Sequence, residues 1–283
     1  MNIAVCVKQV PDTTNVKVDP KTNNLVREGV MSIINPFDLE ALEWALRLRD
    51  QSGSGKVTVI SMGPPQAEGM LQECLNMGAD EAILLSDRAV AGADTLATGY
   101  MLSEIIKTVP YDYVFCGSEA IDGCTGQVGP IIAEKLGLAQ FTYVMDAAIE
   151  NGVLKVTKNI GRYLQMCRTD KKAVVCFLKG LVVPRPQKET DKRPKVVTIE
   201  AFPEADASRV GSAGSPTKVV GIQMSASNQS CYIAIDDSLS AGQRIKMIIS
   251  GGIPQKERPP LIRGTAEALA QKLLGLPEVQ KYI

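Results

Sequence analysis

Residues 117–129, GSEAIDGCTGQVG, have the composition of a loop that could bind a phosphate group. Four of these thirteen residues are glycine, and apolar runs flank the stretch on both sides. Glycine tolerates positive φ and lets the backbone come close to a ligand, and N–H groups at the start of a helix favour an anion. Ser118, Thr125 and Gln127 add side-chain donors, so the stretch is a candidate cradle for phosphates.

The glycine spacing of this stretch matches neither of the common nucleotide-binding fingerprints, the Rossmann motif and the P-loop. The carboxylate of Asp122 would repel a phosphate, although it could cap neighbouring N–H groups or accept a hydrogen bond from a ribose hydroxyl. Two interpretations therefore stay open at this point: a nucleotide-binding loop, and a structural turn between a strand and a helix.

A second group of candidates lies at the start of a strongly predicted helix, in the sequence NPFD. Asn35 suits the N-cap, Pro36 the first helical position, and Asp38 the positive end of the helix dipole. Helix capping is therefore the favoured interpretation of Asp38. The alternative places Asn35 and Phe37 at the end of the sheet, beside an adenine or a flavin.

Three further residues have a structural interpretation and a weaker functional one. Cys6 lies in the first apolar run, and Met62 ends the second predicted strand. We expect Cys6 in the core, although its backbone could line a base pocket, and Met62 at a strand end rather than in contact with a ligand. Trp44 is expected to pack against the core rather than stack on a cofactor.

Histidine is absent from the chain, which removes the commonest general base and the commonest metal ligand. Triads that depend on histidine are thereby excluded. No two cysteines have the CxxC spacing, so an iron–sulfur or structural zinc site is not expected. Most of the cysteines lie in apolar runs, where they act as small hydrophobic residues; the full set is Cys6, Cys74, Cys116, Cys124, Cys167, Cys176 and Cys231.

Strand and helix patterns alternate through the first half of the chain, which indicates a parallel sheet with right-handed crossovers. Ligands of such sheets bind beyond the carboxyl ends of the strands, where Gly117 is expected. From about residue 141 the pattern changes to strand-like runs with tight turns, predicted to form antiparallel hairpins. These runs are 141–150, 152–160, 161–169 and 173–180.

The composition changes again near residue 181, where charge and proline become frequent. Residues 182–195 are predicted to form a loop or an extended arm. Residues 219–253 have strand-like composition, and 263–276 predict a final amphipathic helix with Thr265 as its N-cap. We therefore predict two domains, 1–180 and 181–283.

The composition of the 283 residues is that of a globular protein, 45% hydrophobic and 22% charged. Basic and acidic residues both number 31, so the charge balance gives no indication of nucleic-acid binding. No apolar run approaches the ~20 residues needed to span a bilayer. The amino terminus is predicted to be a strand rather than a signal peptide, so we expect a cytoplasmic protein.

Taken together, several motifs resemble the β subunit of electron-transfer flavoproteins. They are spread along the chain in the family's order: VCVKQVPD, INPFDLEALEWALRL, VTVISMGPPQAEGML, MGADEAILLSD, AIDGCTGQVGP, VGSAGSPTKVV and GTAEALAQKLL. The resemblance covers nearly the whole chain and is dense through about residue 180. It implies an α/β fold in which a parallel sheet binds an adenine nucleotide, with helices on both faces, added antiparallel hairpins and an extended C-terminal arm.

The resemblance also implies a heterodimer with an α subunit that carries a redox FAD. In respiratory members of the family the β subunit holds a structural AMP, and in bifurcating members it holds a second FAD. The implied ligand site comprises Cys6, Asn35, Pro36, Phe37, Asp38, Met62, Ser118, Glu119, Ala120, Ile121, Asp122, Gly123, Cys124, Thr125, Gly126, Gln127, Val128 and Gly129.

The sequences DGCTGQVGP and NPFD are similar to the bifurcating branch, so we expect FAD rather than AMP. A bifurcating subunit would take a hydride from NADH and send single electrons to ferredoxin and to the α-subunit flavin, which serves a flavin dehydrogenase. The chain would thus be an electron-transfer subunit of an oxidoreductase complex. A third hypothesis is a nucleotide-binding regulatory protein similar to universal stress proteins.

The segment by which family members dock to their partner departs from the family pattern. Where NEPRYP is usual, this chain has LVVPRPQKETDKRP, and only Pro184 and Arg185 correspond. Residues 221–256 also look like added sequence. The expected partner is therefore a flavin dehydrogenase, with the acyl-CoA type as one candidate among others.

Overall fold

The computed structural model describes residues 1–12, 17–18, 25–26, 32–218, 240, 242, 245, 264–275 and 280. The chain divides into two compact units, Met1–Ile222 and Gln223–Ile283. In the second unit the structure describes the helix α6 (Ala266–Leu274), where the Thr265 side chain accepts from Ala268 N as predicted for its N-cap. The strands expected at 219–253, and Cys231, lie outside the described residues.

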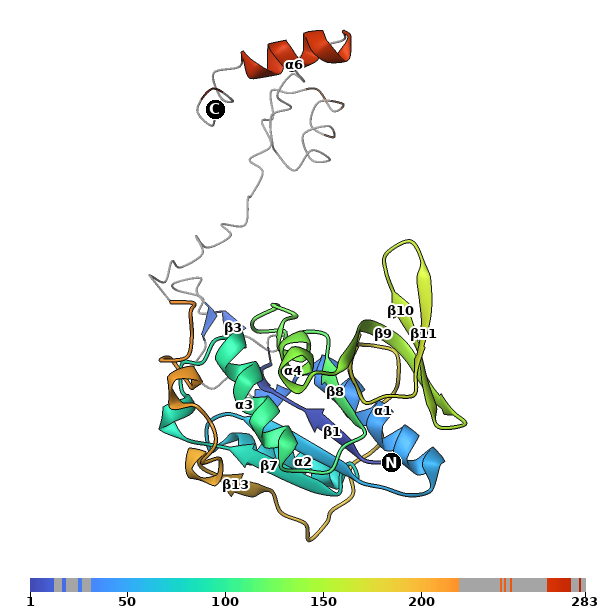
Figure 1. Cartoon of the computed structure of the whole chain (residues 1–283), viewed down its shortest axis with the longest axis vertical. Helices are drawn as coiled ribbons and strands as arrows, with labels where there is room; N and C mark the ends of the chain where they lie inside the picture. The colour runs from blue at the N-terminus through green and yellow to red at the C-terminus, as the bar shows by residue number, and fades with distance from the viewer. Residues whose placement is uncertain are drawn as a thin grey trace. The chain divides into compact units, whose positions relative to one another are not determined.

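The first unit is built on a nine-stranded sheet in the order β11-β10-β9-β12-β8-β1-β6-β7-β13 (Figure 1). The five central strands β12, β8, β1, β6 and β7 pair in parallel, as the alternating pattern predicts. The strands are β1 (Ile3–Cys6), β6 (Val57–Met62), β7 (Glu81–Leu85), β8 (Tyr113–Gly117), β9 (Ala139–Glu150), β10 (Val153–Asn159), β11 (Leu164–Thr169), β12 (Ala173–Phe177) and β13 (Lys195–Val197).

Helices cover both faces of this sheet, because the central strands are apolar on both sides. In β1, Ile3 and Val5 belong to the core under α1 (Pro36–Ser52) and α2 (Ala67–Asn76). Ala4 and Cys6, which point the other way, belong to the core under α3 (Thr95–Lys107) and α4 (Val128–Leu136). The predicted α/β architecture is therefore confirmed.

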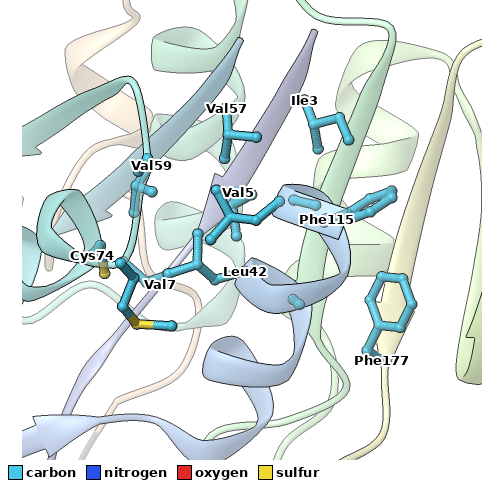
Figure 2. Packing of buried hydrophobic residues seen from close by; sticks show 14 of the residues in the cluster. Ile3, Val5, Val7, Leu42, Val57, Val59, Cys74, Phe115 and Phe177 are labelled. Atoms are coloured by element: carbon cyan, nitrogen blue, oxygen red, sulfur yellow. The ribbon is translucent and has the colours of Figure 1, made fainter. Parts of the chain in front are cut away.

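Figure 2 shows the core on the α1 side, with Leu42 of α1 beside Val5 and Val7. The aromatic rings continue this core along the sheet. Phe115 and Phe177 meet edge to face with centroids 4.9 Å apart, and Trp44 of α1 stacks on Phe177. Trp44 is thus a packing residue, as predicted.

The antiparallel addition is smaller than expected. Only β9, β10 and β11 pair in antiparallel fashion within the described part of this sheet, and the β10–β11 hairpin projects from it (Figure 1). The prediction for 173–180 is wrong in direction, because β12 lies between β8 and β9 and pairs in parallel with both. A short buried strand such as AVVCF has no polar alternation to indicate which neighbours it has.

Shorter elements complete the unit. β2 (Gln9–Pro11) pairs with β5 (Ser32–Ile34), and β3 (Lys17–Val18) pairs with β4 (Leu25–Val26). Single 3₁₀ turns are η2 (Arg88–Val90), η3 (Ile199–Ala201) and η4 (Ala207–Arg209). In the described part of the chain, no helix has both the length and the apolar composition needed to cross a bilayer.

The segment after β12 is fixed to α1 by two buried glutamates. The Glu40 carboxylate accepts hydrogen bonds from the backbone N–H groups of residues 180–182, at 2.6–2.9 Å. Glu43 accepts from the backbone N–H and the guanidinium of Arg185. Farther along, β13 adds a parallel strand beside β7, which the proline-rich composition did not predict. The division expected at residue 180, with a partner-binding region after it, stays a prediction.

Glu40→Ala tests the fixation of this segment. The substitution leaves three backbone N–H groups without their charged acceptor, so we expect the free energy of unfolding to fall by roughly 2–4 kcal/mol. Limited proteolysis should then cut within residues 180–186. Glu200→Ala removes an exposed glutamate and is the matched control. Equal stability and equal protease resistance of the two variants would show that the Glu40 bonds are dispensable.

Candidate functional site

A cavity of about 1040 Å³ lies beyond the carboxyl ends of β1, β6, β7 and β8. This is the edge at which parallel sheets bind ligands. Most residues that line the cavity come from the strand ends and the segments after them, within 6–8, 62–65, 86–98, 116–120 and 123–129. The glycine-rich stretch is one wall, and the segment between β7 and α3 is another.

The glycine-rich stretch folds as a tight turn followed by the start of α4. The N–H groups of Gly123 and Cys124 donate to the carbonyl of Ala120. Cys124 and Gly126 have φ of 50° and 62°, in the left-handed region. None of the backbone N–H groups of residues 125–129 donates to an acceptor among the residues that the structure describes. Such a row of N–H groups at a helix start is suited to an anion.

Asn35 holds the first half of this stretch in place. Its side-chain Nδ2 donates to the carbonyl of Glu119 at 2.8 Å, and its Oδ1 accepts from Ile121 N at 3.2 Å. Asn35 occupies the N-cap position of α1 but makes no side-chain capping hydrogen bond there. The predicted N-cap position is therefore confirmed, but the side chain does not cap the helix: it bonds to the backbone of a loop more than eighty residues away.

Asp38 joins the ends of two central strands. Its carboxylate accepts from Lys8 N at 2.8 Å and from Gly117 N at 3.0 Å, so it does not cap its own helix as predicted. Burial raises the pKa of Asp38 to about 7, against the lowering effect of its hydrogen bonds and of the Lys8 charge. Asp38 is thus a buried carboxyl group at the cavity wall that titrates near neutrality.

Lys8 is a cavity residue that sequence analysis missed. Its Nζ contacts both carboxylate oxygens of Asp122, at 2.7 and 2.8 Å, and the side chain lines the cavity. A single lysine after an apolar strand gives no sequence signal. The pair also gives the Asp122 carboxylate a partner, because the ammonium of a lysine that follows β1 neutralises its charge.

The sequence analysis also did not identify the residues between β7 and α3 as part of the site. Asp94 caps α3 by accepting from Leu96 N and Ala97 N. The same carboxylate accepts from Thr217 N, which brings Thr217 to the cavity. Thr95 Oγ1 lies 2.7 Å from the side-chain oxygen of Gln127 and links this wall to the glycine-rich stretch.

The structure brings most of the predicted site residues to one cavity. Five of them, Asn35, Pro36, Phe37, Ile121 and Asp122, do not line it. Those that line it are Cys6, Asp38, Met62, Ser118, Glu119, Ala120, Gly123, Cys124, Thr125, Gly126, Gln127, Val128 and Gly129.

The described residues offer binding chemistry more than bond-breaking chemistry. The hydrogen bond of Cys176 to Cys116 and its burial raise the pKa of the Cys176 thiol, which stays protonated. No group of three metal-ligating side chains occurs in the described part of the chain. What remains is a row of backbone donors, one titrating carboxyl group and apolar walls, an arrangement that binds and orients a ligand.

Comparison with known proteins identifies a family for the chain. Residues 22–204 match the electron transfer flavoprotein domain. The chain is 51% identical to the electron transfer flavoprotein subunit beta of Thermoanaerobacterium thermosaccharolyticum, over 78% of this chain and 86% of that protein. It is 49% identical to the subunit of the same name from Clostridium acetobutylicum, over 77% and 86%. It is also 49% identical to the caffeyl-CoA reductase-Etf complex subunit CarD of Acetobacterium woodii, over 65% and 71%.

Asp38→Asn tests the titration at the cavity wall. Because the pKa of Asp38 is raised in the folded chain, the folded state binds this proton more tightly than the unfolded state. Its contribution to stability is therefore complete near about pH 4 and is lost as the pH rises towards about 7. We expect the free energy of unfolding of the wild type, minus that of Asp38→Asn, to fall by roughly 2–3 kcal/mol between about pH 5 and about pH 7.

Urea unfolding at several pH values measures this difference. Asp170→Asn, which removes an exposed carboxylate on the same chain, is the control and should give a difference that does not depend on pH. A constant difference for Asp38→Asn over the same range would contradict the assigned titration.

Proposed function

We propose a function from one established premise: the chain belongs to the electron transfer flavoprotein family, as a β subunit, and its role is electron transfer. The finer proposal is that the cavity binds FAD and that, with an α subunit, the chain transfers electrons by flavin-based bifurcation. NADH would be the hydride donor and ferredoxin the low-potential acceptor. Family membership favours this hypothesis over a regulatory nucleotide-binding protein.

The observation that carries the proposal is the size of the cavity. At about 1040 Å³ it lies at the upper end of small-molecule sites, which are roughly 300–1,000 Å³. AMP would occupy only part of this space. FAD contains AMP together with a second phosphate, a ribitol chain and a three-ring isoalloxazine. The extension of the cavity from the glycine-rich stretch to the segment between β7 and α3 supports the larger ligand.

The residues present also fit the charge of FAD. The backbone N–H groups of residues 125–129, which have no acceptor among the described residues, would receive the pyrophosphate, and the start of α4 favours negative charge there. The wall is mostly apolar around these donors, with Met62 and Val128 among its residues. A bound flavin would supply two-electron acceptance and one-electron release, and the protein would fix its position and surroundings.

The partners are part of the proposal. We propose an α subunit as the heterodimer partner and a flavin dehydrogenase as the protein it serves. The similarity to a subunit of a caffeyl-CoA reductase complex supports a partner that acts on an acyl-CoA. Residues 181–283 are proposed to contact these partners, beginning with the segment that Glu40 and Glu43 hold on α1. We also propose a cytoplasmic location.

The proposal is tested by nucleotide analysis of the purified complex. The chain is co-expressed with its α subunit, and the nucleotides released by heat are separated and quantified. We expect FAD in excess of the one equivalent assigned to the α subunit, and no AMP. One FAD together with one AMP per heterodimer would instead identify a β subunit with a structural nucleotide.

Gly129→Ala tests the role of the α4 start in holding the nucleotide. A Cβ at this position would meet the Cys176 Sγ far inside normal contact distance, so α4 must shift away from the sheet. We expect a loss of bound nucleotide of at least about tenfold, on the order of the loss of one good charge-assisted bond. Gly69→Ala, in α2 and outside the cavity lining, places its Cβ in open space; it is the control and should keep the nucleotide.

A second substitution identifies the cause. Cys176→Ala removes the sulfur that the new Cβ would meet, so the double variant Gly129→Ala, Cys176→Ala should regain much of the nucleotide. If the double variant binds no nucleotide while Gly69→Ala retains it, close approach of α4 to the sheet is not what the site requires.

A further inference from the structure

The cavity has an unusual charge balance for a site that receives a phosphorylated ligand. Four acidic residues line it, Asp38, Asp87, Asp94 and Glu119, against two basic ones, Lys8 and Arg88. An anion entering such a cavity would meet net repulsion unless the carboxylates are already engaged and a cation stands near its phosphates.

Three of the four carboxylates are engaged by backbone N–H groups. Asp38 accepts from Lys8 and Gly117, Asp87 from Ala89 and Ile199, and Asp94 from the start of α3 and from Thr217. These carboxylates have structural partners that keep them in the walls. The negative charge of Asp87 and Asp94, and of Asp38 at a pH above about 7, still acts on the cavity, which makes the position of the two cations decisive.

The two cations differ in their relation to the glycine-rich stretch. Arg88 follows β7 on the other wall, and its guanidinium makes no hydrogen bond or ion pair with the described residues. Lys8 follows β1, and its ammonium is held on the glycine-rich stretch by Asp122. Lys8 is therefore the cation that the fold joins to the free N–H groups of residues 125–129.

Both ends of the Lys8–Asp122 pair are fixed by buried side chains. Lys8 N donates to Asp38, and the Lys8 carbonyl accepts from Asn35 N. On the other side, Asn35 Oδ1 accepts from Ile121 N, next to Asp122. The backbone positions of both residues thus depend on the start of α1 and not on the ion pair itself.

We propose that Lys8 binds a phosphate of the nucleotide in this cavity, and that Asp122 is a positioning residue that keeps the ammonium beside the glycine-rich stretch. The inference rests on the proposed nucleotide-binding function and adds a ligand contact to it. This explains why the phosphate-binding loop contains the Asp122 carboxylate: it holds the Lys8 ammonium at the site, and the ammonium neutralises it.

Because the pair is exposed, the Lys8 ammonium can contact a phosphate as well as Asp122. The Lys8 side chain is 51% exposed and that of Asp122 is 29% exposed. Ion pairs as exposed as this one are weak, because water screens them. A phosphate oxygen can therefore share or replace the Asp122 carboxylate at little cost, and the flexible lysine side chain can follow it.

The experiment measures nucleotide binding by the α–β complex after removal of its nucleotides. AMP and FAD are the probes, each titrated calorimetrically at low and at high salt. The variants are Lys8→Gln, Asp122→Asn and the double variant, with Lys158→Gln as the control. Lys158 belongs to β10, outside the cavity lining. The backbone hydrogen bonds of Lys8 do not involve its side chain, so Lys8→Gln is expected to fold normally.

We expect Lys8→Gln to weaken binding about tenfold, the usual effect of losing a hydrogen bond to a charged group. The dependence of affinity on salt should also become shallower, because one cation–phosphate contact is gone. The sign of the Asp122→Asn effect should depend on the background. With Lys8 present the substitution weakens binding slightly, whereas in the Lys8→Gln background it strengthens binding by removing an uncompensated carboxylate.

Three results would overturn the inference. Lys8→Gln could bind as tightly as the wild type and as Lys158→Gln. The two single variants and the double variant could weaken binding equally at both salt concentrations, which would make the pair a structural link without ligand contact. If the wild type bound neither AMP nor FAD, the proposed function would fail first, and the inference with it.

Discussion

The geometry of the cavity depends on the buried polar side chains at the start of α1. Asp38 accepts from the backbone at the ends of β1 and β8, and Asn35 both accepts from and donates to the glycine-rich stretch. Buried polar groups of this kind cannot be left unpaired without a large cost. Each side chain therefore specifies the spacing between segments that are distant in the sequence, and a ligand meets a site that is already formed.

This arrangement determines how an anion can be held. The glycine-rich turn leaves the backbone N–H groups of residues 125–129 without acceptors among the described residues. These groups lie at the start of α4, where the helix dipole favours an anion. The charged side chains that line the cavity are mainly acidic, so backbone donors must make much of the contact with an anion. A chain without histidine can serve such a site, because the demanding chemistry would belong to a bound cofactor and the protein need only place it.

The sequence predicts the parts of this site that repeat a local pattern. Strand–helix alternation predicts the parallel sheet, and the glycine composition predicts the loop at the end of β8. Asn35 and Asp38 are also conspicuous, but local rules assign them to helix capping. Their true partners lie thirty to more than eighty residues away. Capping preference depends on neighbours in the sequence, and tertiary hydrogen bonds here take precedence over it.

Other features have no local pattern to reveal them. Lys8 becomes informative only once the fold places its ammonium on Asp122. β13 is a three-residue edge strand after a proline-rich segment, and its pairing with β7 depends on the path that this segment takes across the fold. The direction of β12 likewise follows from the topology, since any apolar pentapeptide could enter the sheet either way.

α1 links the cavity to the segment that follows β12. Its first turn fixes the cavity through Asp38, and its next turns fix residues 180–185 through Glu40 and Glu43. Both regions therefore share one rigid element whose apolar side is buried in the core. A partner that bound the segment after β12 and shifted it would also shift α1. Because Asp38 of α1 bonds to the ends of β1 and β8, the cavity would change with it. The fold thus joins the segment that we propose to face a partner to the proposed ligand site, by hydrogen bonds to the backbone at both ends of this path.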